Sequence, residues 1–152
     1  MALRNILAAL STAILTASLA PAQGKGVTEV GFTCFGIDTR LQSSSDWVPG
    51  NAVQVDMVTI PNVSAFFMMG AGTPAAVNVP GMPQFCTLYT VPVVSVPAAV
   101  SGGSASLALT IPNDPNLVGA ELTFQGLMTG PSFFFFGNPF ALTNAVGITI
   151  SQ

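Results

Sequence analysis

The segment that most constrains the fold runs from Ser104 to Thr129, SASLALTIPNDPNLVGAELTFQGLMT. In its first part apolar residues alternate with small or polar ones as far as Ile111, which predicts a half-buried strand rather than a helix. Pro112 ends this strand, because it has no N–H to give to a sheet. Alternation resumes at Ala120 and predicts a second strand. One face of it would carry Leu122, Phe124 and Met128, and the other Glu121, Thr123 and Gln125.

The residues between these strands predict one short helical turn. Asp114 can accept hydrogen bonds from free N–H groups at a helix start, and Pro115 suits the first helical position, where its missing donor costs nothing. Leu117 and Val118 would pack this turn onto the core. Gly119 can end it in a left-handed conformation.

Residues 1–22 predict a secretory signal peptide. Arg4 supplies a positive start, an apolar run extends from Ile6 to Leu19, and Ala20-Pro21-Ala22 has the small-x-small pattern of a cleavage site. Cleavage after Ala22 is preferred. The run is shorter than the roughly 20 residues that span a bilayer, although an uncleaved anchor is the alternative. We therefore expect a single domain over residues 23–152, secreted or at the surface or in the periplasm of a bacterium, with no membrane span after cleavage.

Charge is scarce in this expected domain. Lys25 and Arg40 are its basic residues, against six acidic ones. Two cations cannot neutralise a run of phosphates, which argues against nucleic-acid binding. Surfaces with so little charge tend to carry apolar patches that meet a partner.

Cys34 and Cys86 are the two cysteines. In an exported chain a disulfide between them is the expected state, with two buried free thiols as the alternative.

The rest of the chain adds further short strands separated by Gly- and Pro-rich turns. We expect strands over residues 30–35, 51–60, 63–69, 85–91 and 141–150. Pro92 and Pro97 restrict the segment between them to an edge strand or an extended loop. Residues 36–50, 72–84 and 129–139 are expected to be irregular. About seven strands with almost no helix predict an all-β, antiparallel β-sandwich.

The C-terminal two thirds resembles a poorly characterised all-β domain of secreted bacterial proteins. The resemblance rests on the string Ile111-Pro112-Asn113-Asp114-Pro115-Asn116-Leu117-Val118-Gly119, which matches I-P-N-D-P-x-L-V-G. Cys86, the strand before this string, and Thr143-Asn144-Ala145 with Thr149-Ile150 add weaker matches. The resemblance implies a secreted all-β module and carries no catalytic residues.

The residue types present favour a protein without catalytic function. The chain has no His, which excludes Ser-His-Asp, Cys-His and imidazole-ligated zinc sites. Lys25 could activate a serine, but it lies two residues from the expected chain start, where order is poor. Asp38 and Asp46 could form a glycosidase-like pair, and the Asn113–Asn116 segment could bind calcium, but turn and capping roles explain these residues. We expect neither a cofactor nor a metal.

Two candidate contact sites remain. Phe133, Phe134, Phe135 and Phe136 form an aromatic run that would either cover an open end of the sandwich or serve as a patch for self-association or adhesion. Trp47, with Asp46 and Tyr89, would form an aromatic platform for carbohydrate if the indole were exposed. The alternative is a Trp47 ring that packs in the core or within its loop. We expect a structural or surface-interaction role, with self or other cell-surface proteins as partners. The alternative is a carbohydrate-binding module.

Overall fold

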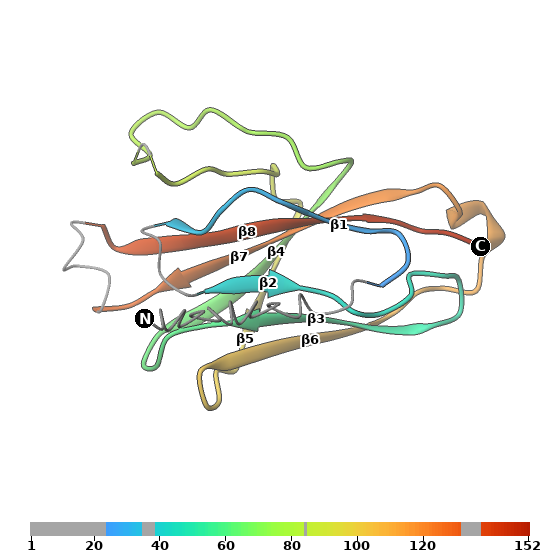
Figure 1. Ribbon diagram of the computed structural model, residues 1–152, viewed down its shortest axis with the longest axis horizontal. Coiled ribbons are helices and arrows are strands. Elements are labelled where there is room, and N and C mark those ends of the chain that lie inside the picture. The colour runs from blue at the N-terminus through green and yellow to red at the C-terminus, as the bar shows by residue number, and fades with distance from the viewer. Residues whose placement is uncertain (1–23, 35–38, 84, 132–137) are drawn as a thin grey trace, which may run out of the picture.

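The computed structural model describes residues 24–34, 39–83, 85–131 and 138–152 (Figure 1). These residues form eight strands and one 3-10 turn. The elements are β1 (Val27–Val30), β2 (Arg40–Gln42), β3 (Ala52–Val58), β4 (Ser64–Ala71), β5 (Val94–Ala98), β6 (Ser104–Thr110), η2 (Pro115–Leu117), β7 (Glu121–Thr129) and β8 (Phe140–Thr149). The expected signal segment, Asp38 and the run Phe133–Phe136 lie outside the described residues.

The strands form two antiparallel sheets, which confirms the all-β sandwich. Sheet A has five strands in the order β1-β8-β7-β4-β5, and sheet B has three in the order β2-β3-β6. Apolar side chains of both sheets meet in one core. Its largest fully buried members include Trp47, Phe67, Phe124, Leu41, Met57 and Met128.

The segment from Ser104 to Thr129 folds as its pattern predicts. β6 pairs with β3 without a register shift, and β7 is covered by β4 and β8 on its two edges. Between them, the side chain of Asp114 accepts a hydrogen bond from the backbone N–H of Asn116 at 2.9 Å, with Pro115 next in the chain. Gly119 has φ +87°, the left-handed conformation expected at the end of the turn.

Three expectations about strands are wrong. In place of the strand predicted over 30–35, the structure has β1, which is four residues long and stops before Gly31 because that residue has φ +79°. The segment 36–50, expected to be irregular, contains the short strand β2. Residues 85–91 form no strand. Only an isolated bridge joins Val77 to Leu88, because this segment belongs to a long loop with backbone bonds of its own.

The described residues of that loop, 72–83 and 85–93, lie over the outer face of sheet A, and we call them the cover loop (Figure 1). It explains why β7 is buried on both faces. Thr123 and Gln125 lie on the face opposite Phe124, as predicted, yet both are 0% exposed. The Gln125 amide donates to the carbonyl of Thr87 at 2.8 Å, and its oxygen accepts from the N–H of Tyr89 at 2.9 Å.

The expected disulfide between Cys34 and Cys86 is confirmed. It ties the segment after β1 to the cover loop. Cys34 Sγ also accepts a hydrogen bond from the N–H of Leu142 at 3.2 Å, at a point of β8 beyond its pairing with β1.

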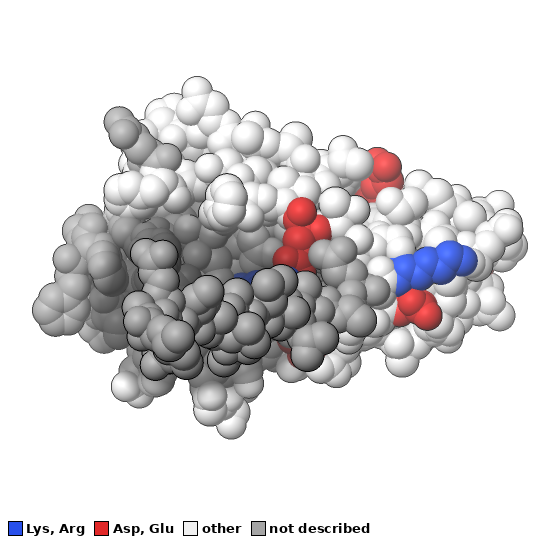
Figure 2. All heavy atoms as spheres, in the orientation of Figure 1, with Lys and Arg blue, Asp and Glu red and all other residues white. Residues whose placement is uncertain are grey.

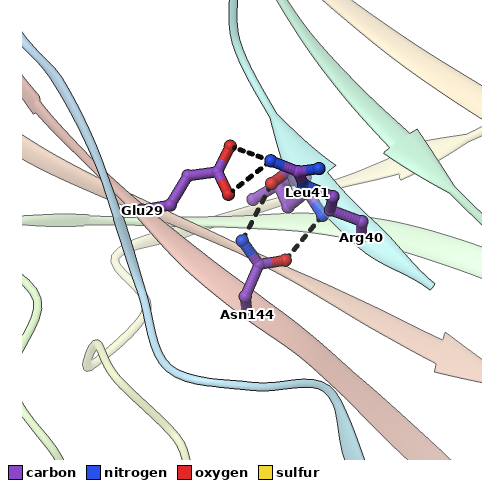
Figure 3. A network of polar contacts seen from close by, with 4 residues as sticks. All are labelled: Glu29, Arg40, Leu41 and Asn144. Carbon is purple, nitrogen blue, oxygen red and sulfur yellow. Dashed lines mark hydrogen bonds and ion pairs between the residues drawn. The ribbon is translucent and has the colours of Figure 1, made fainter. Parts of the chain in front are cut away.

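One side of the sandwich is closed by polar side chains that cross between the sheets (Figure 3). The amide of Asn144, in β8, accepts from the N–H of Leu41 at 2.7 Å and donates to its carbonyl at 2.9 Å. Nearby, Arg40 in β2 bonds both carboxylate oxygens of Glu29 in β1, at 2.9 and 2.8 Å. Within the described ranges no helix has the length and apolar character that a membrane crossing requires.

Candidate functional site

Trp47 is not part of an exposed platform. Only 1% of this residue is exposed, and its ring lies 5.5 Å from that of Phe124 between centroids. The indole N–H donates to Ser43 Oγ at 3.1 Å, so its one polar group is satisfied inside the protein. The exposed indole that the platform requires is therefore not present, and the structure has the alternative, a Trp47 ring packed into the core.

The other two platform residues do not join the Trp47 ring in one site. Asp46 is exposed, and its carboxylate accepts from the backbone N–H of Lys25 at 2.8 Å. Tyr89 is partly exposed in the cover loop, where its ring lies against Gly31, so closely that a Cβ there would come within 2.3 Å of the ring. Trp47 and Tyr89 line two different pockets, so the structure does not bring the three residues into one site.

The pocket beside Trp47 lies at one end of the sandwich and has a volume of about 270 Å³. It is formed where β6 ends, η2 turns and β7 begins, near the C-terminus (Figure 1). No charged residue lines it. Its lining consists of Trp47, Leu109, Thr110, Ile111, Pro112, Leu117, Ala120, Leu122 and Ile150. Such a pocket can hold a small apolar group, but it offers no polar anchor to orient a sugar or to catalyse a reaction.

A second depression of about 340 Å³ lies between the end of β4 and the cover loop. Tyr89, Val91 and Val93 are among the residues that line it. Beside it the chain carries a run of exposed apolar side chains into β5: Val91 is 69% exposed, Val93 76% and Val94 42%. We call these three residues the valine strip.

The described part of the chain carries little charge. Within residues 24–34, 39–83, 85–131 and 138–152 the cations are Lys25 and Arg40, and Arg40 is paired with Glu29. Figure 2 shows how sparse charged side chains are on the face in view, most of whose described atoms belong to uncharged residues. An exposed apolar strip on a charge-poor surface is the kind of surface that meets a partner or an apolar substrate.

The carboxylates do not assemble into a catalytic or metal-binding cluster in the part of the chain that the structure describes. Asp114 uses its carboxylate to cap η2, and that of Asp56 accepts from Gln54 and Ser106 at 2.6 Å each. No group of three or more Cys, Asp or Glu residues is placed there to hold a metal ion.

Sequence reasoning did not single out the valine strip. The signal was present as V-P-V-V, but alternation alone cannot tell which valines tertiary contacts will leave uncovered. The aromatic run at 133–136 stays a prediction, since it lies outside the described residues.

Comparison with known proteins identifies no relative. No family model, no curated protein and no solved structure matches this chain.

Proposed function

We propose that this chain is an exported, non-catalytic β-sandwich with a structural or surface-interaction role, exercised through adhesion or self-association. The valine strip is the observation that carries the proposal. Three exposed valines on one continuous stretch, with Pro92 among them, expose apolar area that a partner or apolar surface would remove from water.

The disulfide supports a location outside the cytoplasm of a bacterium. Disulfides persist in oxidising compartments, and this one is buried, with Cys34 1% and Cys86 6% exposed. The bond holds the cover loop against the sandwich, and the valine strip begins at the end of that loop. A protein acting at a surface outside the cell would gain from having its contact region fixed in this way.

The alternative of a carbohydrate-binding module lacks its expected basis. Its platform required an exposed Trp47, and the indole is covered. The pocket beside that ring is lined by apolar residues, whereas a sugar site needs polar groups placed to accept and donate hydrogen bonds.

The test is retention of the oxidised protein on an octyl-substituted matrix. Residues 23–152 suffice, because every described strand lies between Val27 and Thr149. If the matrix buries both side chains completely, Val91→Ser combined with Val93→Ser should weaken the free energy of binding by about 2 kcal/mol. This corresponds to a loss of retention of up to roughly thirtyfold.

The matched control is Val58→Ser combined with Val118→Ser, which changes two exposed valines outside the strip. This control should be retained nearly as well as the unmodified chain. Equal retention of the control and the strip variant, with both proteins folded, would contradict the assignment of the contact to the valine strip. An unmodified chain that is not retained at all would refute the adhesive function.

A further inference from the structure

Each sheet of the sandwich ends in two edge strands, and a bare edge strand presents unpaired N–H and C=O groups that can pair with another chain. Sheet A ends at β1 and β5, and sheet B ends at β2 and β6. The four edges differ sharply in how they are protected.

The β1 and β2 edges lie on the side closed by polar side chains (Figure 3). The N–H and C=O of Leu41, in the middle of β2, are both taken by Asn144. β1 is four residues long and carries the charged Glu29, which is held by Arg40. Short length, charge and occupied backbone groups all discourage pairing with a further strand.

The β5 edge is protected by Pro97. This residue stands opposite Phe66 in the pairing with β4, so its missing N–H belongs on the solvent side of the strand. A second chain could not form a continuous ladder along β5, because a donor is missing and the ring occupies its place.

Among the described residues, nothing protects the β6 edge in these ways. This strand is seven residues long, keeps its register with β3 throughout, and contains no charged residue and no proline. It runs along the lower margin of the molecule in Figure 1, and in sheet B it has a neighbour on one edge alone, β3.

The hydrogen bonds that flank the ladder show which groups of β6 point outward. Thr59 N–H donates to Gly103 O at one end, and Ile111 N–H donates to Asn51 O at the other. Because backbone direction alternates along a strand, the odd-numbered residues of β6 bond to β3 and the even-numbered ones face the free edge. The free groups are therefore those of Ser106, Ala108 and Thr110, since Ser104 already exchanges bonds with Ser101.

We propose that β6 pairs antiparallel with β6 of a second copy of this chain, about a twofold axis at Ala108. Ser106 of each copy would then lie opposite Thr110 of the other, and Ala108 opposite Ala108. Each such pair exchanges two hydrogen bonds, roughly six in all, and the two copies of sheet B become one continuous sheet.

The side chains on β6 favour a second copy as the occupant. An isologous contact places every residue near its own duplicate, so any charge near the axis would repel itself. β6 has none, and its outward positions carry Ser, Ala and Thr, which are small and exposed. The nearest carboxylate, Asp56, lies one strand away and is already bonded to Ser106 and Gln54.

This inference rests on the proposed self-association and assigns it to β6, whereas adhesion stays with the valine strip. Pairing of one strand buries less area than a stable permanent dimer needs, so the dimer should be weak and dependent on concentration. It should also stop at two copies, because a twofold contact is closed and uses up the free β6 edge of each copy.

The experiment is sedimentation velocity on oxidised residues 23–152 over a hundredfold range of concentration. Ala108→Lys places two like charges across the axis and should weaken dimerisation at least tenfold. The control, Ala76→Lys, makes the same change at an exposed alanine of the cover loop and should leave dimerisation unchanged. If Ala108→Lys does not fold, Thr110→Lys places the charge at a second exposed position of the same edge.

Amide hydrogen exchange gives an independent readout. Raising the concentration of the unmodified chain should protect the amides of Ser106, Ala108 and Thr110. Association that persists in Ala108→Lys, with these amides unprotected, would overturn the pairing through β6 and leave self-association to another surface. A monomer at every concentration would also overturn it, whereas retention on the octyl matrix tests adhesion separately.

Discussion

Asn144→Ala should destabilise the fold strongly, because Asn144 completes the hydrogen bonding of a strand in the other sheet. Its amide is the partner of both backbone groups of Leu41, at 2.7 and 2.9 Å. Leu41 is 0% exposed and Asn144 5%, so water does not reach these groups readily. Each buried backbone group left without a partner costs about 1–3 kcal/mol. The two together predict a loss of about 3 kcal/mol, taking the lower half of the range because alanine leaves room for a water molecule.

The assay is urea unfolding followed by the fluorescence of Trp47, the one tryptophan of the chain, which is buried in the core. A loss of about 3 kcal/mol is a large share of the 5–15 kcal/mol that a domain typically has, so the unfolding midpoint should fall clearly. Asn144→Asp should be at least as damaging, because it replaces the N–H donor to the Leu41 carbonyl with an oxygen.

The control is Asn51→Ala. Asn51 is exposed, and its side chain donates one long hydrogen bond, 3.3 Å, to the carbonyl of Asp46. Its replacement should cost less than about 0.5 kcal/mol. If Asn144→Ala lies within 1 kcal/mol of the unmodified chain, the inference that this amide is needed to hold β2 in the sandwich is refuted.

Two further predictions concern the cover loop. Replacing Cys34 and Cys86 together with alanine opens a link between residues 52 apart in the sequence, and should lower the free energy of unfolding by up to about 4 kcal/mol in urea titrations; no change would show that the bond adds nothing to stability. Gln125→Ala removes the side-chain partners of Thr87 O and Tyr89 N–H, and the Tyr89 amide should then exchange its hydrogen at least about tenfold faster. An unchanged exchange rate would refute the role of Gln125 in holding the loop.

The sequence predicted the parts of the fold that local pattern specifies. Strict alternation identified β3 and β6, and the inward residues Val53, Val55 and Met57 are buried as expected. The capping residue Asp114 and the following Pro115 identified the turn between β6 and β7, because capping depends on residues that are close in sequence.

Elements that depend on distant contacts were missed. β2 is three residues long and has no alternation to reveal it, since it is held by an amide 103 residues further along the chain. Trp47 lies in an irregular segment, as predicted, but local pattern could not decide between exposure and burial of its ring. The indole N–H donates to Ser43, and the Trp47 carbonyl accepts from the N–H of Ser151, a residue more than 100 positions away. Exposure of the valine strip likewise depends on which side chains the tertiary fold leaves uncovered.

The four sheet edges differ in how they are protected, and this difference is stronger evidence for pairing through β6 than the apolar content of that strand. This chain has few charged residues that could block pairing at its sheet edges. The ion pair of Arg40 and Glu29 lies at the β1 and β2 edges. Proline guards β5. Were β6 under the same pressure to avoid contact, a single lysine at an exposed position such as Ala108 would suffice, because edge charges block strand pairing at little cost to the monomer. The seven residues of β6 contain no such lysine, as expected of an edge strand that pairs with another chain. Ala108→Lys introduces this lysine and so distinguishes a paired β6 edge from an unpaired one.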